Sequence, residues 1–409
     1  MNADNRLTNM KKRLLFVIYL FFFYLFLFYP QFRGIPVLLS PYILIALLSF
    51  FLIFSNISSL KQNYRLFKKE ILLLLLLCFF TEFRVLLNGE YDISTLIYTY
   101  YWIIVIPLFI FYLNKINVKT DQQIFSIILV VGAIASLISS FCVISPSFNS
   151  YVKEQLLVED EFLSMNNYRG FGIAYRLTSS YGFILGVILG MSILLYNKFK
   201  WFFLFIPFML LSIILNARTG IIISLASLLV FFFYTKRKIY FIIIISFLFI
   251  FLLYFLVDIV FLLGLEEKSV MFIVEFLDEI IGTYESGNIS NSTAGTLMGE
   301  MWIMPSSIIE WLVGSGIYLF SMHKSDVGWV NQLNFGGILY LTLIIVLFYI
   351  MLRRLVRIGY KPLALFLFIA LVIINTKGIL YPSIMELNLF FFLYYSIVRY
   401  KLLYYQKPC

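Results

Sequence analysis

Long apolar runs separated by short polar segments dominate the pattern of hydrophobic and polar positions along the chain. Each run has about 14 to 22 residues, close to the roughly 20 that an α-helix needs to cross a bilayer core. The pattern therefore predicts an all-α polytopic membrane protein of about 12 transmembrane helices, with residues 1–409 forming a single membrane domain. The predicted spans are 14–29, 36–54, 71–87, 96–113, 124–145, 177–196, 201–216, 220–234, 239–257, 332–352, 362–375 and 384–400.

Two of these runs, 201–216 and 220–234, are short and are separated only by Ala217, Arg218 and Thr219. They fit either a tight hairpin of two spans or one broken element. We count two spans, because the basic residues before the first run and after the second then lie on the same side of the membrane.

Composition supports the membrane prediction and excludes most soluble folds. Hydrophobic residues make up 62% of the chain and charged residues only 13%, whereas a soluble domain is about half apolar with roughly a quarter charged residues. The net charge of +10 would also suit a nucleic-acid binder. The placement of the charges, however, indicates orientation in a membrane and no nucleic-acid partner.

The charges separate between alternate segments. With the N-terminus inside, the inner segments hold 22 of the 31 Lys and Arg residues and three acidic residues, whereas the outer segments hold eight cations and 16 anions. Positively charged residues favour the cytoplasmic side of membrane proteins. We therefore expect a multi-pass protein of a bacterial cytoplasmic (inner) membrane, with both the N- and C-termini cytoplasmic.

The outer segments are very unequal, with long loops at 146–176 and 258–331 and four short ones. Residues 269–281 have an amphipathic pattern that predicts a helix lying along the membrane surface or packing on the bundle. Residues 308–313 are expected to form a second short helix after Pro305. The turn-rich stretch 285–295 reads as a mobile tip. The inequality of the loops argues against the internal repeats of many transporters.

Signatures of soluble enzymes and of metal sites are missing. The chain has no phosphate-binding P-loop, no HExxH motif and no CxxC pair, and it has one histidine. Its cysteines, Cys78, Cys142 and Cys409, are too far apart in sequence to suggest a disulfide framework. We expect neither a metal nor another cofactor.

Three arginines in the acidic outer segments are the first candidate site. Arg169 and Arg176 lie in YRGFGIAYR, before the span at 177–196, and Arg218 lies in NARTG, between two spans. Arginine is always charged and donates paired hydrogen bonds, which suits it to a diphosphate. In the plainer interpretation, these residues pair with the acidic residues 159–161 or with lipid headgroups.

The second candidate site is the glycine-rich polar stretch 313–341, which contains His323 and Asp326. Either side chain could act as general base toward a sugar hydroxyl. The plainer interpretation of Asp326 is a helix cap, favoured by its place near a helix N-terminus. Trp302, Trp311 and Trp329 lie nearby in the sequence and could stack on sugar rings.

Charged residues also fall inside or at the ends of spans. Arg84 and Glu82 lie near the outer end of the span at 71–87, where charges are costly and usually have a partner or a role. Both lie near enough to the interface to snorkel, that is, to extend the charged group back to water. Lys377 and Glu386, at the outer ends of the last two spans, allow the same interpretation.

With these motifs, the chain resembles the bacterial O-antigen and capsular polysaccharide polymerases (Wzy-type), which belong with the O-antigen ligases in one broad superfamily. The resemblance rests on about twelve spans, two long outer loops, YRGFGIAYR, NARTG and the GSG…HKSDVGWV…FGG stretch. It implies a GT-C-like membrane fold and an inverting, metal-independent glycosyltransferase. The implied reaction joins undecaprenyl-diphosphate-linked oligosaccharide repeat units by block transfer on the outer side of the membrane, in O-antigen and lipopolysaccharide biosynthesis.

Carried over by position, the resemblance implies that Arg169, Arg176 and Arg218 bind the diphosphate and that Asp326 or His323 orients or deprotonates the acceptor. From its place near the end of a span, and not from the resemblance, we expect Arg84 to be a supporting residue. Expected partners are the lipid-linked oligosaccharide, membrane lipids and a chain-length regulator.

Two other functions fit parts of the pattern. A lipid-linked oligosaccharide flippase would also be basic, rich in aromatic residues and close to twelve spans. It should, however, have charges lining an internal cavity and short loops on both faces. An O-antigen ligase would share the arginine chemistry and differ in its acceptor.

Overall fold

The computed structural model describes residues 3–34, 61, 64–88, 99–103, 105, 120–156, 172–174, 179–217, 219–234, 301–316, 325–383 and 385–404. The regular secondary structure among these residues is helical, without a strand; Phe32 and Leu156 form an isolated β-bridge. The helices are α1 (Ala3–Phe28), α4 (Lys68–Asn88), α6 (Asp121–Ile144), α7 (Pro146–Gln155), α9 (Ser179–Leu194), the 3₁₀-helix η2 (Lys200–Phe205), α10 (Ile206–Asn216), α11 (Thr219–Tyr234), α15 (Ile308–Val313), α16 (Gly328–Arg357), α17 (Lys361–Lys377) and α18 (Met385–Tyr404).

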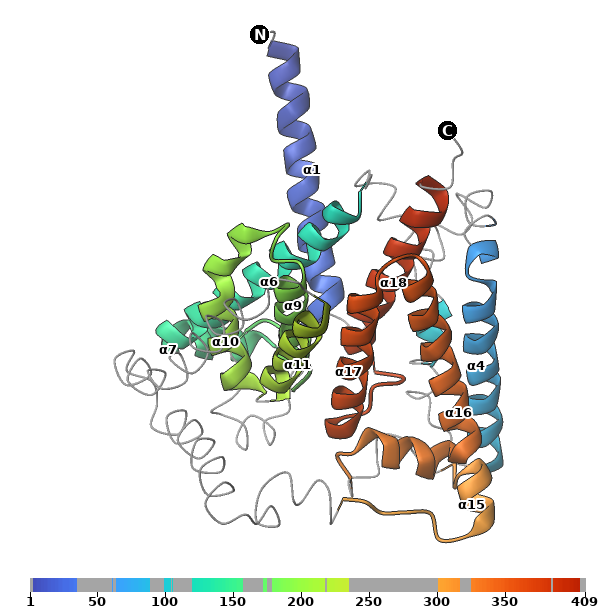
Figure 1. Ribbon diagram of the computed structural model, residues 1–409. Coiled ribbons are helices and arrows are strands. Elements are labelled where there is room, and N and C mark those ends of the chain that lie inside the picture. Colours follow the sequence, from blue (N-terminus) through green and yellow to red (C-terminus); the bar gives the residue numbers. More distant parts are fainter. Residues whose placement is uncertain are drawn as a thin grey trace.

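The helices form two adjoining groups (Figure 1). Helices α6, α9, α10 and α11 lie together on one side of the molecule, and α4, α16, α17 and α18 lie on the other. Helix α17 joins the groups, because it packs on both α9 and α11 as well as on α16. Helix α9 is buried at every position from Tyr181 to Ile193, as expected of a helix that is apolar all round and surrounded by others.

Local sequence signals account for several helix starts. Thr120 and Gln123 form a reciprocal capping box before α6. The Ser145 hydroxyl caps α7, whose first residue is Pro146. The Ser307 hydroxyl caps α15 by accepting a hydrogen bond from the amide of Glu310. The prediction of a short helix at residues 308–313 is therefore confirmed.

Several predicted spans coincide with helices, and one differs in shape. Residues 201–216 and 220–234 fall in separate helices, with a break at Ala217, whose backbone is extended. The span predicted at 332–352 is part of the longer α16, which is kinked at Gly337 (φ 64°, ψ −167°). In the described part of the chain, α6 and α16 are long and apolar enough to cross a membrane. The predicted spans 36–54 and 239–257 and the amphipathic segment 269–281 lie outside the described residues.

Glycines bring α9 unusually close to its neighbours. Gly182, Gly186 and Gly190 recur every four residues and so lie along one face of α9. A methyl group on Gly186 would overlap the backbone of Gly220 on α11, and one on Gly190 would overlap the Phe366 ring on α17. Small residues at this spacing allow close backbone packing between membrane helices.

Large apolar side chains are exposed along the outward faces of the helices. On α4 they recur at the three- and four-residue spacing of one helical face: Leu72, Leu75, Leu76, Phe79, Phe83, Leu86 and Leu87. On α11 they are Ile222, Leu225, Leu229, Phe232 and Phe233. Contiguous apolar surface of this kind is rare on monomeric proteins in water and marks contact with a membrane or another protein.

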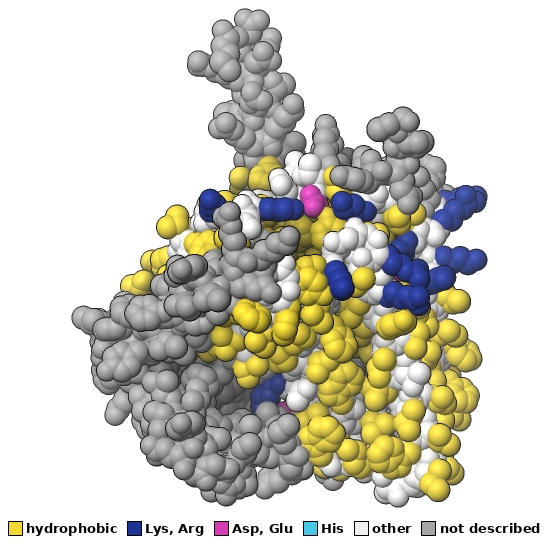
Figure 2. All heavy atoms as spheres, viewed as in Figure 1, with side chains coloured by type: hydrophobic (Ala, Val, Ile, Leu, Met, Phe, Trp, Pro, Cys, Tyr) yellow, Lys and Arg dark blue, Asp and Glu magenta, His cyan; other side chains and the backbone are white. Residues whose placement is uncertain are grey.

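The helix ends lie at two opposite ends of the molecule. One, the basic end, contains the starts of α4, α6 and α17 and the ends of α11, α16 and α18. Figure 2 shows Lys and Arg side chains in a band across this end, above a broad hydrophobic surface. Contacts that join these helix ends include the ion pair of Lys198 with Asp121 (3.7 Å) and the hydrogen bond from Tyr360 to Asp121 (2.8 Å).

A buried carboxylate ties three helices together at the basic end. Glu70 on α4 is 1% exposed and accepts a hydrogen bond from Arg354 on α16 (2.8 Å) and another from the Tyr394 hydroxyl on α18. The Arg354 guanidinium also lies over the Phe67 ring, 5.4 Å from its centre. Removing one partner of a buried pair leaves an uncompensated charge, so this triad fixes how α4, α16 and α18 sit together.

The close contact between α9 and α11 predicts an unusual effect of Gly186→Ala. Alanine should gain about 1 kcal/mol in helix propensity, but overlap with the Gly220 backbone should cost about 1–3 kcal/mol. We expect net destabilisation, measured as a lower midpoint of thermal unfolding for the purified protein in detergent.

The matched control is Gly378→Ala. Gly378 has an extended backbone (φ −166°), and a methyl group there would lie 3.9 Å from its nearest neighbours. The midpoint of thermal unfolding of Gly378→Ala should stay close to that of the unchanged protein. Equal stability of the two variants would contradict glycine-dependent packing of α9.

Candidate functional site

Opposite the basic end, the starts of α9, α16 and α18 meet the ends of α4 and α17; we call this the loop end. Gly328, the first residue of α16, lies so close to Gly378 that a side chain there would overlap its carbonyl group. Next to it, the buried Asn375 amide donates to Gln332 (2.9 Å), and Gln332 donates to the carbonyl of Tyr381 (3.0 Å). These amides satisfy one another within an apolar environment and join α16 to α17.

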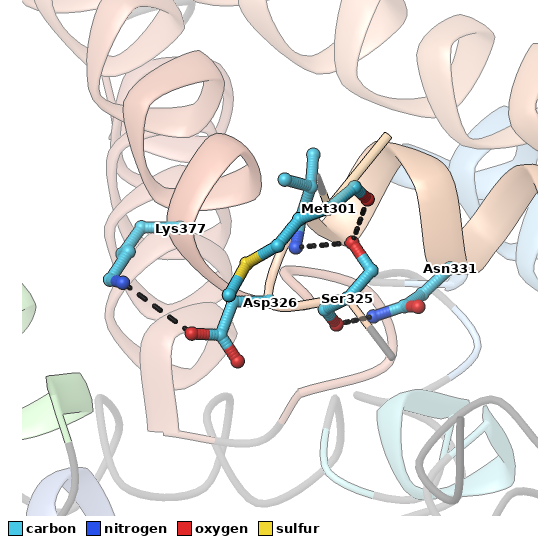
Figure 3. Close-up of polar contacts among 6 residues, drawn as sticks. Met301, Ser325, Asp326, Asn331 and Lys377 are labelled. Atoms are coloured by element: carbon cyan, nitrogen blue, oxygen red, sulfur yellow. Dashed lines mark hydrogen bonds and ion pairs between the residues drawn. The ribbon is translucent and has the colours of Figure 1, made fainter. Parts of the chain in front are cut away.

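Asp326 faces Lys377 at the loop end (Figure 3). The Asp326 carboxylate lies 3.4 Å from the Lys377 ammonium group at the end of α17. The Asp326 side chain is 59% exposed and that of Lys377 is 28% exposed. A pair this open to solvent contributes about 0–1 kcal/mol to stability, so it does little to hold the fold together.

The short segment that carries Asp326 is fixed by its neighbours. The Ser325 hydroxyl donates to the carbonyl of Met301 (2.6 Å) and accepts from the amide of Val327 (3.0 Å). The Asn331 amide, one turn into α16, donates to the Ser325 carbonyl (2.8 Å) (Figure 3). Asp326 therefore projects from a backbone held on both sides.

Arg84 supports the crossing of α15 and α16. Arg84 is 8% exposed, and its guanidinium donates to the carbonyl of Gly314 (2.7 Å), directly after α15. The amides of Ser315 and Gly316 then bond to the carbonyls of Asn334 and Phe335, just before the kink in α16. Gly314 has φ of 74°, and a side chain there would overlap the backbone at Phe335. Only glycine fits both requirements.

A second carboxylate, Glu386, is buried in the first turn of α18 (5% exposed). It accepts hydrogen bonds from the hydroxyls of Ser180, on the first turn of α9, and Ser383. The helix N-terminus also favours a negative charge at this position. Glu386 thus links the start of α9 to the start of α18.

The sequence interpretations of these residues need three corrections. Asp326 is not a helix cap, because the N-cap of α16 is Val327, which makes no side-chain cap bond. Arg84 does not snorkel to solvent, because its side chain points inward to Gly314. Glu386 does not reach solvent either, because two hydroxyl groups hold its carboxylate inside the protein.

The other candidate residues are not placed by the structure. Arg169, Arg176, Arg218 and His323 lie outside the described residues. The described residues next to two of them are informative. Ala217 and Gly220, on either side of Arg218, pack against Gly182 in the first turn of α9, which begins three residues after Arg176.

Sequence reasoning missed the way these polar residues combine. Ser383 and Glu386 have the S-x-x-E spacing of a capping box, a signal that could have identified Ser383 as a partner. Gln332 and Asn375 are buried amides in apolar helices, and such residues usually bond to each other across a helix interface. The pairing of Asp326 with Lys377 joins residues 51 positions apart, and no local pattern indicates it.

From the sequence we expect no metal or other cofactor, and we expect exposed tryptophans that could stack on sugar rings. Among the residues that the structure describes, no group of three or more His, Cys, Asp or Glu side chains is arranged to hold a metal ion. Trp302 and Trp311 are partly exposed (41% and 37%), near α15.

Glu310 on α15 accepts hydrogen bonds from the hydroxyl and amide of Ser306, and these bonds lower the pKa of its carboxyl group.

The contact of Arg84 with Gly314 predicts that Arg84→Gln loosens the crossing of α15 and α16. A hydrogen bond from a charged group contributes about 1.5–3 kcal/mol, so amide exchange at Ser315 and Gly316 should accelerate about tenfold or more. Hydrogen–deuterium exchange of the purified protein measures this. Glu82→Gln is the control, because Glu82 lies on the same helix and accepts from Tyr100 instead; equal exchange in both variants would refute the assigned role.

Comparisons of the chain with known proteins give no family assignment. No protein-family model matches it, and no curated protein matches it. The residues described above are therefore the basis on which a function can be inferred.

Proposed function

We propose that this protein is a polytopic membrane glycosyltransferase that polymerises a surface polysaccharide. In this proposal about twelve helices cross a bacterial cytoplasmic membrane, the basic end faces the cytoplasm and the loop end faces outward. The substrates are oligosaccharide repeat units linked to undecaprenyl diphosphate, which the protein joins by block transfer. The proposal combines the resemblance of the sequence to the Wzy-type polymerases with the arrangement of the loop end.

The surface and charge distribution support the membrane part of this proposal. The exposed apolar faces of α4 and α11 suit contact with lipid better than contact with water. Below the band of Lys and Arg side chains, the visible surface is mainly hydrophobic (Figure 2). Positive charge at one end of a helical bundle is typical of the cytoplasmic side.

One observation carries the catalytic part: a continuous set of contacts joins the described neighbours of Arg218 to Asp326. Ala217 packs on Gly182, and the next residue on α9, Phe183, lies 3.9 Å from the position of a methyl group on Gly378. Gly378 follows Lys377, which pairs with Asp326. The segment that carries Arg218, proposed to bind the diphosphate, and the segment that carries Asp326, proposed to bind the acceptor, thus both lie near the end of α17.

In the proposed reaction, the arginines act on the leaving diphosphate, and Asp326 or His323 acts on the acceptor hydroxyl. The growing glycan leaves a lipid diphosphate, whose developing charge the guanidinium groups of Arg169, Arg176 and Arg218 stabilise. Loss of one such donor in other enzymes costs about 10²–10³ in rate. The acceptor hydroxyl bonds to Asp326 or His323, which orients it and takes its proton. Lys377 holds the Asp326 carboxylate in place.

The diphosphate role predicts that Arg218→Ala abolishes long glycan chains while the protein still inserts at normal levels. A glycan gel of cells expressing the variant, with an immunoblot of the membrane fraction, measures both. A polymerase defect leaves one repeat unit on the acceptor. Glycan absent from the lipid core would indicate a ligase, and units stranded inside the cell would indicate a flippase. Normal chain lengths in Arg218→Ala would exclude the proposed diphosphate contact.

The acceptor role predicts different effects for the two members of the Asp326–Lys377 pair. Asp326→Asn removes the proton acceptor and should lower polymerisation about 10²-fold or more. Lys377→Met removes the same ion pair but keeps the carboxylate, so chains should still form. The rate of polymerisation of purified lipid-linked repeat units measures the difference. If both variants lose activity equally, Asp326 acts only through its pair with Lys377.

A further inference from the structure

An elongated cavity lies between α16 and α17, and neither Asp326 nor Lys377 lines it, although its wall reaches Asn375 near the end of α17. Its volume is about 480 Å³, within the range of about 300–1,000 Å³ that is common for ligand sites. Apolar side chains form most of its wall, among them Ile345, Phe348, Leu352, Ala364 and Phe368. Its composition therefore suits a hydrocarbon chain.

The cavity follows the two helices for most of the length of α17. On α17 its lining extends from Lys361 to Asn375, which corresponds to about 21 Å at 1.5 Å per residue. One leaflet of a bilayer core is about 15 Å thick, half of the total of about 30 Å. A single acyl chain that enters at the basic end would fit along the cavity within its own leaflet.

Two cations lie at the basic end of the cavity. Arg353 and Lys361 both line it, and both are exposed. Each lies over an aromatic ring, Arg353 at 5.8 Å from the centre of Tyr349 and Lys361 at 5.9 Å from that of Tyr234. Neither forms an ion pair with an acidic side chain among the described residues. The neighbouring Arg354 differs, because it binds Glu70.

We propose that this cavity binds one anionic phospholipid from the leaflet at the basic end. Its phosphate lies between Arg353 and Lys361, and an acyl chain occupies the apolar groove between α16 and α17. Charge complementarity selects this occupant: two cations meet a monoanionic headgroup, whereas a zwitterionic lipid brings its own cation to the same place. The site requires the chain to lie in a membrane, as proposed above, but it is independent of the glycan chemistry.

The test uses the full-length protein in detergent, titrated with dioleoylphosphatidylglycerol or dioleoylphosphatidylcholine and measured by native mass spectrometry. Phosphatidylglycerol should bind more tightly. The double variant Arg353→Gln/Lys361→Gln should weaken its binding about fivefold for each cation removed, a factor equivalent to about 1 kcal/mol per basic residue near an anionic lipid. Binding of phosphatidylcholine should change little.

The matched control, Lys69→Gln/Arg357→Gln, removes the same charge from exposed positions at the basic end that do not line the cavity. It should leave phosphatidylglycerol binding unchanged. Ile345→Trp, at a half-exposed lining position, should reduce the binding of both lipids by filling the groove. Its melting temperature, measured alongside, confirms that the variant is folded.

Three results would overturn the proposal. They are equal affinity for the two lipids, an equal loss of affinity in the control double variant, and displacement of phosphatidylglycerol by undecaprenyl phosphate with an affinity that does not depend on Arg353 or Lys361. The last result would assign the groove to a polyprenyl chain. The glycan gel for Arg218→Ala is unaffected by any of these outcomes, so failure of this proposal and failure of the proposed function can be told apart.

Discussion

The close backbone contact of α9 with α11 is the constraint on which the loop end depends. Gly182 and Gly186 let the two backbones touch, and Gly190 makes room for Phe366 of α17. In lipid there is little hydrophobic force between helices, so close van der Waals packing of this kind is what holds a bundle together. Because α17 is positioned by the same face of α9, the contact also determines where Lys377 lies.

Buried polar groups join the helices at both ends of the molecule, but the groups differ between the two ends. At the basic end, Glu70 joins α4, α16 and α18 through a buried charge pair. At the loop end, Glu386 and the amides Gln332 and Asn375 hold the helix starts together. The Asp326–Lys377 pair differs from all of these because it is open to solvent. Buried polar groups hold the helices in place, whereas the exposed pair contributes little to the architecture.

Long apolar runs predicted most of the helix positions that the structure describes, because such a run is a local property of the sequence. The short helix at 308–313 was also predictable, since a serine cap and a preceding proline are local signals. The kink at Gly337 was not, because a glycine within an apolar run fits a straight helix equally well. The Leu312 backbone passes so close to Gly337 that a side chain there would overlap it, and this contact joins segments 25 residues apart.

The candidate site was predictable only in part. The sequence identified Asp326 and Arg84 as residues of interest, but their partners, Lys377 and the Gly314 carbonyl, come from distant segments. The positions of Arg169, Arg176, Arg218 and His323 stay predictions, because these residues lie outside the described part of the chain. The structure does describe residues close to two of them in the sequence: Ala217, directly before Arg218, and Gly182, in the helix that follows Arg176.

The partner of Arg84 has one more consequence. A carbonyl oxygen carries only a partial charge, so the bond to Gly314 leaves the guanidinium with its full positive charge; among the described residues it has no acidic neighbour within ion-pair distance. Water screens a buried charge poorly. The electric field of a buried charge therefore reaches further through the protein than the field of a charge on the surface. The buried Arg84 guanidinium is therefore a source of positive potential beneath the crossing of α15 and α16, and it favours negatively charged groups nearby over positively charged ones.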